Sequence, residues 1–425
     1  MAEIFDFTKV SDSCIKCGKC IPGCTIHLVN SDEVTSPRGF LDLLGAYKRG
    51  ELELDKNAKD IFESCFLCTH CTDVCPNDLP VDMVIEEVRY DIAQKYGISW
   101  FKRAFFFLLR HRKIMDLANK LGYVFHSCAF KKDEKRGGIL ARFSLPMIKK
   151  GRLLPSLASK SFLNSYDERI SFGKRGKVAI FIGCLANYNY TSIGDSLIKI
   201  LKTLEYEVFI PKKQKCCAAP AYFTGDFKTV EVLAKENIEY FESFIDEVDA
   251  IIIPEATCSA MIKHDWEVFF ENRGMIEWAK RAKKLNDKIF MATEWLYKHT
   301  NLKDILKERG KKIDELITYH DPCHAKKVQG IYNEPRELLK ISFNLKEMSN
   351  PDRCCGFGGV TMQTEKFHLA KKAGEPKAKM IQDTKAKIVS AECSACRMQI
   401  SNSLNEANVD AVFKNPIELI AKALE

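Results

Sequence analysis

Two cysteine runs near the amino terminus constrain this 425-residue chain more than any other feature. Both runs have the spacing C-x-x-C-x-x-C-x-x-x-C, in which three thiolates bind one 4Fe-4S cluster and the fourth binds a neighbouring cluster. We therefore expect two 4Fe-4S clusters with crossed ligands. The cysteines predicted for one cluster are Cys14, Cys17, Cys20 and Cys75, and those predicted for the other are Cys65, Cys68, Cys71 and Cys24.

A pair of zinc knuckles is the alternative for these runs. Such sites need four ligands in looser spacing, and they give no reason for two identical crossed runs. One departure from the two-cluster pattern is that Cys24 precedes Thr25, whereas Cys75 precedes Pro76. Because the spacer at residues 37–49 has a helical pattern, we predict an α-rich ferredoxin-type domain over residues 1–98.

The 18 cysteines fit a reducing compartment better than a secreted disulfide framework. The chain is long for such a framework, and its start (MAEIFDFTKV) has no apolar segment behind basic residues. The longest apolar run, residues 104–109, is far shorter than the roughly 18 to 20 residues of a membrane helix. We expect a cytoplasmic protein, with peripheral association at the inner face of the cell membrane as a further option.

Positive charge is concentrated in one segment. Residues 99–177 hold 19 Lys and Arg against 5 Asp and Glu, whereas the net charge of the whole chain is only +8. Apolar residues recur with helical spacing over residues 100–125, which predicts a helix followed by a linker. The helix fits an anionic membrane surface, an acidic partner subunit, or a cover over the cluster domain. Nucleic acid is not an expected partner, since no recognition fold accompanies the charge. The same segment contains Cys128, which lies outside every cysteine pattern and is expected to be a free buried thiol.

A duplicated α/β pattern fills the carboxyl-terminal half. Short β-branched runs alternate with amphipathic helices after Lys177, which predicts small parallel sheets. The cysteines give the duplication a register, because three pairs lie 139, 138 and 135 residues apart: Cys184 and Cys323, Cys216 and Cys354, Cys258 and Cys393. We predict a basic helical linker over residues 99–177 and two tandem modules over residues 178–310 and 311–425.

Each module has cysteines directly behind its predicted strands. Ligands of open parallel sheets bind beyond the carboxyl ends of the strands, so these thiolates should meet at one end of each sheet. The second module offers five cysteines, which are Cys323, Cys354, Cys355, Cys393 and Cys396. The first offers four, which are Cys184, Cys216, Cys217 and Cys258, because Met261 stands where the second module has Cys396.

The second module resembles the CCG-domain proteins, through Cys354-Cys355-Gly356, a leading cysteine and a trailing Cys393-x-x-Cys396. That family includes heterodisulfide reductase catalytic subunits, in which five cysteines of one module hold a non-cubane 4Fe-4S cluster. The whole layout looks most like the iron-sulfur subunit of glycolate oxidase and its relatives in anaerobic glycerol-3-phosphate and lactate oxidation. The resemblance implies a further Fe-S cluster in the second module, with Cys354 and Cys355 as catalytic residues.

The first module departs from that family pattern. It reads Cys216-Cys217-Ala218, and the thioether of Met261 cannot replace a bridging thiolate, so we expect a four-cysteine Fe-S cluster, a zinc ion or no metal there. The second module is intact, and we expect the working cluster in it, with structural zinc as the alternative. His320 and His324, beside Cys323, could donate protons or hydrogen bonds that raise the cluster potential.

The chain has no G-x-G-x-x-G behind a predicted strand, so we expect no dinucleotide or flavin on it. An electron-transfer chain without a hydride acceptor needs a partner, and we expect a separate FAD-containing dehydrogenase subunit. The leading hypothesis is the iron-sulfur subunit of a flavin-dependent 2-hydroxyacid dehydrogenase, of the glycolate or lactate type, that passes electrons towards quinone. The alternatives are a heterodisulfide-reductase-like disulfide or thiol reductase subunit, the iron-sulfur subunit of an anaerobic glycerol-3-phosphate dehydrogenase, and a zinc-holding assembly subunit.

Overall fold

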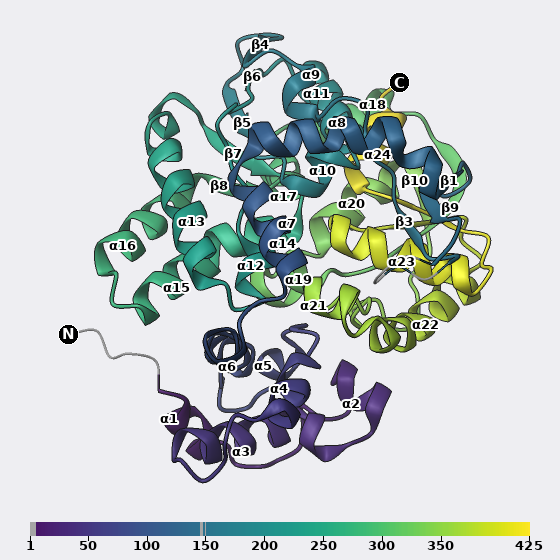
Figure 1. Cartoon of the computed structure of the whole chain (residues 1–425). Coiled ribbons are helices and arrows are strands. Elements are labelled where there is room, and N and C mark those ends of the chain that lie inside the picture. Colours follow the sequence, from purple (N-terminus) through teal and green to yellow (C-terminus); the bar gives the residue numbers. More distant parts are fainter. Residues whose placement is uncertain (1–5, 145–147, 149) are drawn as a thin grey trace.

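A computed structural model describes residues 6–144, 148 and 150–425 of the chain. Its amino-terminal part is a small helical domain at one end of the molecule (Figure 1). Its helices are α1 (Phe7–Asp12), α2 (Thr25–Asn30), α3 (Pro37–Lys48), α4 (Lys56–Glu63), α5 (His70–Asp73) and α6 (Val81–Tyr96). The two cysteine runs lie in the loops and short helices between α1 and α6. The α-rich character predicted for this part is therefore confirmed.

Helix α3 is the helix predicted between the cysteine runs. It begins at Pro37, and the hydroxyl oxygen of Ser36 accepts a hydrogen bond from the Gly39 N–H at 3.0 Å, which caps the helix. Its inner face buries Phe40, Leu41 and Leu44 against α6. A hydrophobic core between α3 and α6 thus supports the cysteine loops.

A five-stranded sheet forms the centre of the first module. Its strands are β4 (Arg169–Ser171), β5 (Lys177–Ile180), β6 (Glu207–Phe209), β7 (Ala250–Ile253) and β8 (Ile289–Met291), in the order β4-β6-β5-β7-β8. Four strands are parallel, as predicted, whereas β4 pairs with β6 antiparallel. Strand β4 belongs to the segment that the sequence assigns to a linker, so this edge of the sheet was not predicted.

The second module repeats this parallel arrangement with four strands. They are β9 (Ile313–Tyr319), β10 (Phe343–Leu345), β11 (Ile388–Ser390) and β12 (Val412–Lys414), in the order β10-β9-β11-β12. All three pairings are parallel, and the order matches β6-β5-β7-β8 of the first module. The duplication read from the cysteine spacing is thus present in the strand order.

Helices surround both sheets. Those of the first module are α10 (Cys184–Tyr188), α11 (Ser192–Thr203), α12 (Ala219–Tyr222), α13 (Phe227–Glu242), α14 (Ala256–Ala260), α15 (Trp266–Asn272) and α16 (Ile276–Leu285), followed by α17 (Ala292–His299) and α18 (Leu302–Arg309). Those of the second are α19 (Cys323–Gln329), α20 (Asn333–Ser342), α21 (Gly359–Thr364), α22 (Phe367–Thr384), α23 (Ser394–Glu406) and α24 (Pro416–Ala423). One hydrophobic cluster runs through both modules, since Ile180 and Leu197 share it with Tyr319 and Ile417.

Two buried glutamates also join the modules. The Glu255 carboxylate of the first module accepts a hydrogen bond from the Ser394 N–H of the second at 2.7 Å. The Glu392 carboxylate of the second accepts one from the Thr293 N–H of the first at 3.2 Å. Burial raises the pKa of Glu255 to about 7 and that of Glu392 to about 8. Each module thus caps a helix of the other.

The basic segment contains more than the predicted helix and linker. The helical part is two helices, α7 (Trp100–Arg110) and α8 (Arg112–Ala129), which are separated at His111. An antiparallel sheet of β1 (Phe130–Asp133), β2 (Gly138–Ala141) and β3 (Leu153–Pro155) follows, and it was not predicted. Cys128 is exposed, so the expectation of a buried thiol is wrong. Among the described residues no helix combines the length and apolar character needed to cross a membrane.

Arg89 of α6 fixes the amino-terminal domain against the first module. Arg89 is 2% exposed, and its guanidinium donates to the Cys65 carbonyl at 2.7 Å and to the Phe223 carbonyl at 2.8 Å. Gly225, two residues after Phe223, packs against the backbone of Arg89. Its φ is +86°, and a Cβ on Gly225 would lie 2.3 Å from the Arg89 carbonyl oxygen. This interface therefore depends on a buried cation and on a close backbone approach.

We expect Arg89→Met to lower the free energy of unfolding by about 3 kcal/mol, because the Cys65 and Phe223 carbonyls would stay buried without a donor. Anaerobic urea unfolding of the metal-loaded protein measures this. The matched control is Arg103→Met, which removes an exposed guanidinium from α7. Equal midpoints for Arg89→Met and the control would contradict the proposed strength of the interface.

Candidate metal centres

The eight amino-terminal cysteines surround two hollows. One is lined by Cys24 of the first run together with Cys65, Cys68 and Cys71 of the second. The other is lined by Cys14, Cys17 and Cys20 of the first run together with Cys75 of the second. The structure therefore brings together each of the crossed sets expected from the spacing. Cys71 lines both hollows, so the two sites are direct neighbours.

The two runs have the same local backbone. Lys16 and Leu67, each two residues behind the first cysteine of its run, both have positive φ, of 56° and 49°. Gly18 and Thr69, two residues further on, repeat this with φ of 76° and 56°. These left-handed residues turn the chain around the sulfurs, so that the Leu67 N–H donates to the Cys65 sulfur at 3.4 Å. Thiol spacing and backbone conformation thus match in both runs.

All five cysteines of the second module line one hollow. They are Cys323 at the start of α19, Cys354 and Cys355 in the loop before α21, Cys393 behind β11, and Cys396 in α23. The sulfurs of Cys355 and Cys396 are 3.3 Å apart, and the Gly356 N–H donates to the Cys354 sulfur at 3.3 Å. Gly356 has a φ of +87°, which explains the glycine behind the cysteine pair. A set of five thiols exceeds the four that tetrahedral zinc takes and fits an Fe-S cluster.

Burial and hydrogen bonds shift the pKa values of these five thiols in different directions, raising those of Cys323, Cys354 and Cys396. Hydrogen bonding with Cys354 and Cys396 lowers the pKa of the Cys355 thiol, and hydrogen bonding with Cys396 lowers that of Cys393 to about 7. The hydroxyl of Thr257, from the first module, lies 3.5 Å from the Cys393 sulfur. The first module therefore contributes to the surroundings of the second module's sulfurs.

His320 does not fit the donor role expected for it. It is 1% exposed, and its Nδ1 lies 2.9 Å from the Pro351 carbonyl, so this nitrogen carries the proton. Burial lowers the pKa of His320 to about 3, and the ring is neutral. Among the described residues its Nε2 has no hydrogen-bond partner, and one nitrogen of the ring lies within 4.8 Å of the sulfurs of Cys355 and Cys396. Because Nδ1 carries the single proton of the neutral ring, Nε2 has a lone pair and no N–H to donate.

Lys377 is a site residue that the sequence did not reveal. This lysine of α22 is fully buried, and its ammonium donates to the Asn350 carbonyl at 2.8 Å. Burial lowers the pKa of Lys377 to about 8, and the neighbouring thiolates of Cys355 and Cys354 oppose that shift. A lysine in an amphipathic helix normally faces solvent, so only the packing of α22 identifies this buried cation.

The amino-terminal and second-module sites meet at one contact. The thiol of Cys68 interacts with the thiol of Cys354. This interaction and burial together raise the pKa of Cys68. Phe66 and Leu67, from the same loop as Cys68, line the hollow of the second module. The sulfur sites therefore form a continuous series from the first hollow, through Cys71 and Cys68, to Cys354.

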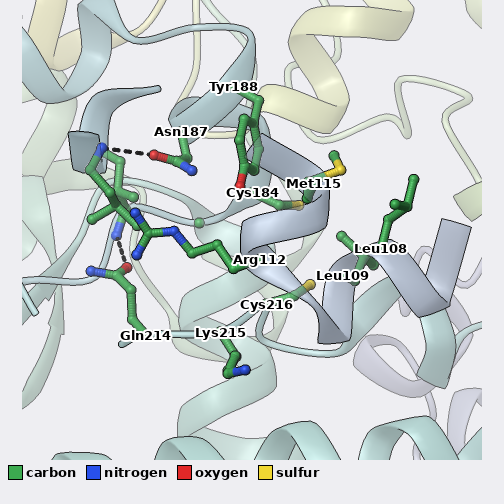
Figure 2. A pocket seen from close by; sticks show the side chains of 13 residues that line it. Leu108, Leu109, Arg112, Met115, Cys184, Asn187, Tyr188, Gln214, Lys215 and Cys216 are labelled. Atoms are coloured by element: carbon green, nitrogen blue, oxygen red, sulfur yellow. Dashed lines mark hydrogen bonds between the residues drawn. The ribbon is translucent and has the colours of Figure 1, made fainter. Parts of the chain in front are cut away.

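The first module brings its four cysteines together at the equivalent end of its sheet. The sulfurs of Cys217 and Cys258 are 3.3 Å apart, and the Cys184 thiol interacts with that of Cys216. Cys184 and Cys216 line a hollow of about 40 Å³ together with Arg112 and Met115 of α8, and Figure 2 shows these four side chains. Met261 is fully buried in the hydrophobic cluster that contains Cys216, Cys217 and Cys258. A fifth sulfur ligand is replaced there by an apolar side chain.

A larger cavity of about 400 Å³ lies between the modules. Thiols of both modules line it, as do aromatic rings of α7; the lining includes Cys184, Cys217, Cys258, Cys393, Phe101 and Phe105. The carboxylate of Glu255 also lines this cavity. The cysteine-bearing ends of the two sheets therefore face a common space.

Comparison with known families agrees with this arrangement. A model described as a cysteine-rich domain, CCG, matches residues 178–263 and again residues 317–401. A model of a 4Fe-4S dicluster domain matches residues 10–79. The chain belongs to the CCG family of iron-sulfur proteins. Within this family it carries one intact five-cysteine module and one module that lacks the last cysteine.

Individual relatives cover most of the chain. A probable glycolate oxidase iron-sulfur subunit of Bacillus subtilis is 27% identical over 402 residues, with 91% of this chain and 88% of the relative covered. Lactate utilization protein A 1 of Bacillus mycoides is 33% identical over 230 residues, which are 54% of this chain and 89% of the relative. A subunit of the CoM/CoB fumarate reductase of Methanothermobacter marburgensis is 27% identical over 430 residues, with 99% of this chain and 74% of the relative covered.

A solved structure shares the overall fold. The crystal structure of a hypothetical protein from Helicobacter pylori aligns with a TM-score of 0.54 at 11% sequence identity, covering 99% of this chain and 74% of that one.

The crossing of the amino-terminal ligands has a direct test. We expect Cys24→Ser and Cys65→Ser to remove the same EPR signal of a reduced 4Fe-4S cluster, although these cysteines belong to different runs, because both line one hollow. Cys20→Ser and Cys75→Ser should remove the other signal. Anaerobic iron determination would accompany the spectra. Loss of one signal by Cys20→Ser and Cys24→Ser together would show that the runs bind uncrossed.

Proposed function

We propose that this chain is the iron-sulfur subunit of a flavin-dependent 2-hydroxyacid dehydrogenase, of the glycolate or lactate type, that carries electrons from an FAD-containing partner subunit towards quinone. The observation that carries the proposal is the continuous series of sulfur sites, in which Cys71 joins the two amino-terminal hollows and Cys68 meets Cys354. The names of the Bacillus relatives, a probable glycolate oxidase subunit and lactate utilization proteins, support the substrate class.

In this proposal the cysteines hold Fe-S clusters, which transfer single electrons when bound. The two crossed sets each hold a 4Fe-4S cluster, and the five cysteines of the second module hold a further one. The four cysteines of the first module hold an Fe-S cluster or a structural metal, since Met261 supplies no fifth thiolate. Cys354 and Cys355 take the central role, because Cys354 receives the contact from Cys68.

The chain's own residues prepare the route for electrons. Phe66 and Leu67 exclude water between the amino-terminal and second-module sites. The Lys377 ammonium supplies positive charge behind the cysteine pair, and the Gly356 N–H supplies a hydrogen bond to sulfur. Both features stabilise added negative charge, so they favour electron acceptance at the second module.

The proposal is tested with the chain and the flavoprotein that copurifies with it under anaerobic conditions. Lactate or glycolate should bleach the visible Fe-S absorption of this chain only when the flavoprotein is present, and a soluble benzoquinone should restore the absorption. An iron content near zero, or clusters that the reduced flavoprotein leaves oxidised, would refute the proposal. Disulfide reduction by the isolated chain would instead favour the disulfide reductase alternative.

Cys354→Ser separates the second module from the amino-terminal sites. We expect quinone reduction to fall to background while both amino-terminal 4Fe-4S signals remain, because Cys354 lies in the second-module hollow. Cys128→Ser is the matched control, since Cys128 is exposed and lies outside every cysteine pattern. Undiminished quinone reduction by Cys354→Ser would show that the second module is not on the electron route.

Lys377→Met should lower the reduction potential of the second-module cluster by on the order of 50 mV, because a nearby positive charge stabilises the reduced form. Anaerobic redox titration followed by EPR measures the potential. The control is Lys379→Met, which removes an exposed ammonium from the same helix. A potential that is equal in both variants would mean that Lys377 acts only through packing.

A further inference from the structure

Helix α8 presents an apolar face to the outside of the protein. Five large apolar side chains recur at helical spacing on this face: Ile114, Leu117, Leu121, Val124 and Phe125 are 44%, 57%, 51%, 58% and 62% exposed. We call these residues the α8 stripe. Figure 1 shows α8 on the side of the two modules that is remote from α1–α6. The stripe is therefore far from the surface that the amino-terminal domain covers.

The inner face of α8 is polar. Asn119 is the one buried residue of this fully described helix, and its amide donates to the Ala158 carbonyl at 2.9 Å. Asp116 accepts hydrogen bonds from the Tyr188 hydroxyl at 2.7 Å and from the Asn164 amide at 3.2 Å. A surface helix of a globular protein normally turns its apolar side inwards. The reversed order in α8 marks the stripe as an interaction surface.

The charge around the stripe is positive. Lys113 and Lys120 border it on the outer face of α8, and Lys131 and Lys132 follow in β1. All four are exposed, and none has an ion-pair partner among the described residues. Asp116 is the single carboxylate of α8, and its hydrogen bonds hold it on the inner side. The outer face thus combines an apolar centre with uncompensated cations.

We propose that the outer face of α8 binds the surface of an anionic membrane. The α8 stripe enters the boundary between headgroups and acyl chains, and Lys113 and Lys120 meet the lipid phosphates, as in interfacial amphipathic helices. This inference rests on the proposed quinone-linked function, because quinone resides in the bilayer. The sequence predicted that the helix at the start of the basic segment contacts the membrane. Phe106 of that helix, α7, is 1% exposed and packs in the first module's core, so we place the membrane contact on α8 instead.

The α7 helix connects this face to the cavity between the modules. Phe101 and Phe105 of α7 line the cavity, and α7 and α8 contact each other. Leu109 of α7 and Met115 of α8 line the hollow beside Cys184 and Cys216. A membrane bound at α8 would therefore lie next to the helices that enclose the sulfur sites of the first module.

The test is flotation of the metal-loaded full chain with vesicles of phosphatidylcholine alone or with added phosphatidylglycerol. The wild type should float with the anionic vesicles and bind neutral ones at least about fivefold more weakly. Leu117→Gln combined with Leu121→Gln should abolish flotation with both. Lys113→Glu combined with Lys120→Glu should weaken binding to anionic vesicles by about tenfold or more. Because these residues are exposed, the fold and iron content should not change.

Two control pairs match these variants elsewhere on the surface. Leu28→Gln with Val34→Gln removes exposed apolar side chains from the amino-terminal domain, and Lys372→Glu with Lys379→Glu reverses two exposed charges on α22. Both pairs should float like the wild type. Wild-type protein that floats with neither vesicle, or stripe variants that still float, would overturn the proposal.

A loss of flavoprotein binding in the stripe variants would also overturn it and would assign α8 to a protein interface. Reduction of the clusters by lactate and the flavoprotein is measured in the same samples without lipid. That signal reports on the proposed function alone, so its failure is distinguishable from failure of membrane binding.

Discussion

Cys68 interacts with Cys354, and this contact joins the second cysteine run to the cysteine pair of the second module. The contact needs α5 to pack on α19 and α2 to pack on α22, as they do. Arg89 holds the same loop against the first module, and the Lys366 ammonium of the second module donates to the Asp60 carbonyl of α4 at 2.8 Å. The position of the amino-terminal domain is thus set by interactions that keep two sulfur loops together.

The duplicated modules share a strand order but differ at one ligand. Cys396 lies 3.3 Å from Cys355, whereas Met261 packs among Cys216, Cys217 and Cys258 without adding a thiolate. The second module also contains Lys377, and it is the module that Cys68 contacts. The two copies therefore form an asymmetric pair, in which the five thiols, the buried Lys377 and the contact with Cys68 all belong to the intact copy. Three of the four cysteines of the impaired copy, Cys184, Cys217 and Cys258, line the cavity shared by both modules.

Reversed amphipathicity separates α8 from the other long helices. Helices α11 and α13 bury rows of Ile, Leu and Val in the module cores, whereas α8 buries Asn119 and exposes the α8 stripe. An apolar pattern of helical period is identical in both situations, because periodicity records which residues share a face and not where that face points. The predicted helix over residues 100–125 was thus right in kind, while its division at His111 and its outward apolar side follow from packing.

The sequence by itself determined the chemistry and the repeat. The spacing of the cysteines predicted the crossed sets, the five-cysteine module and its impaired copy, and the hydrophobic pattern predicted the order of strands and helices. Long-range packing decided the rest: the Cys68–Cys354 contact, the buried Lys377, the burial of His320 against the Pro351 carbonyl, strand β4 and the exposed face of α8. These features depend on which surfaces meet between residues far apart in the chain, and burial of that kind leaves no periodic or spaced signal in the sequence.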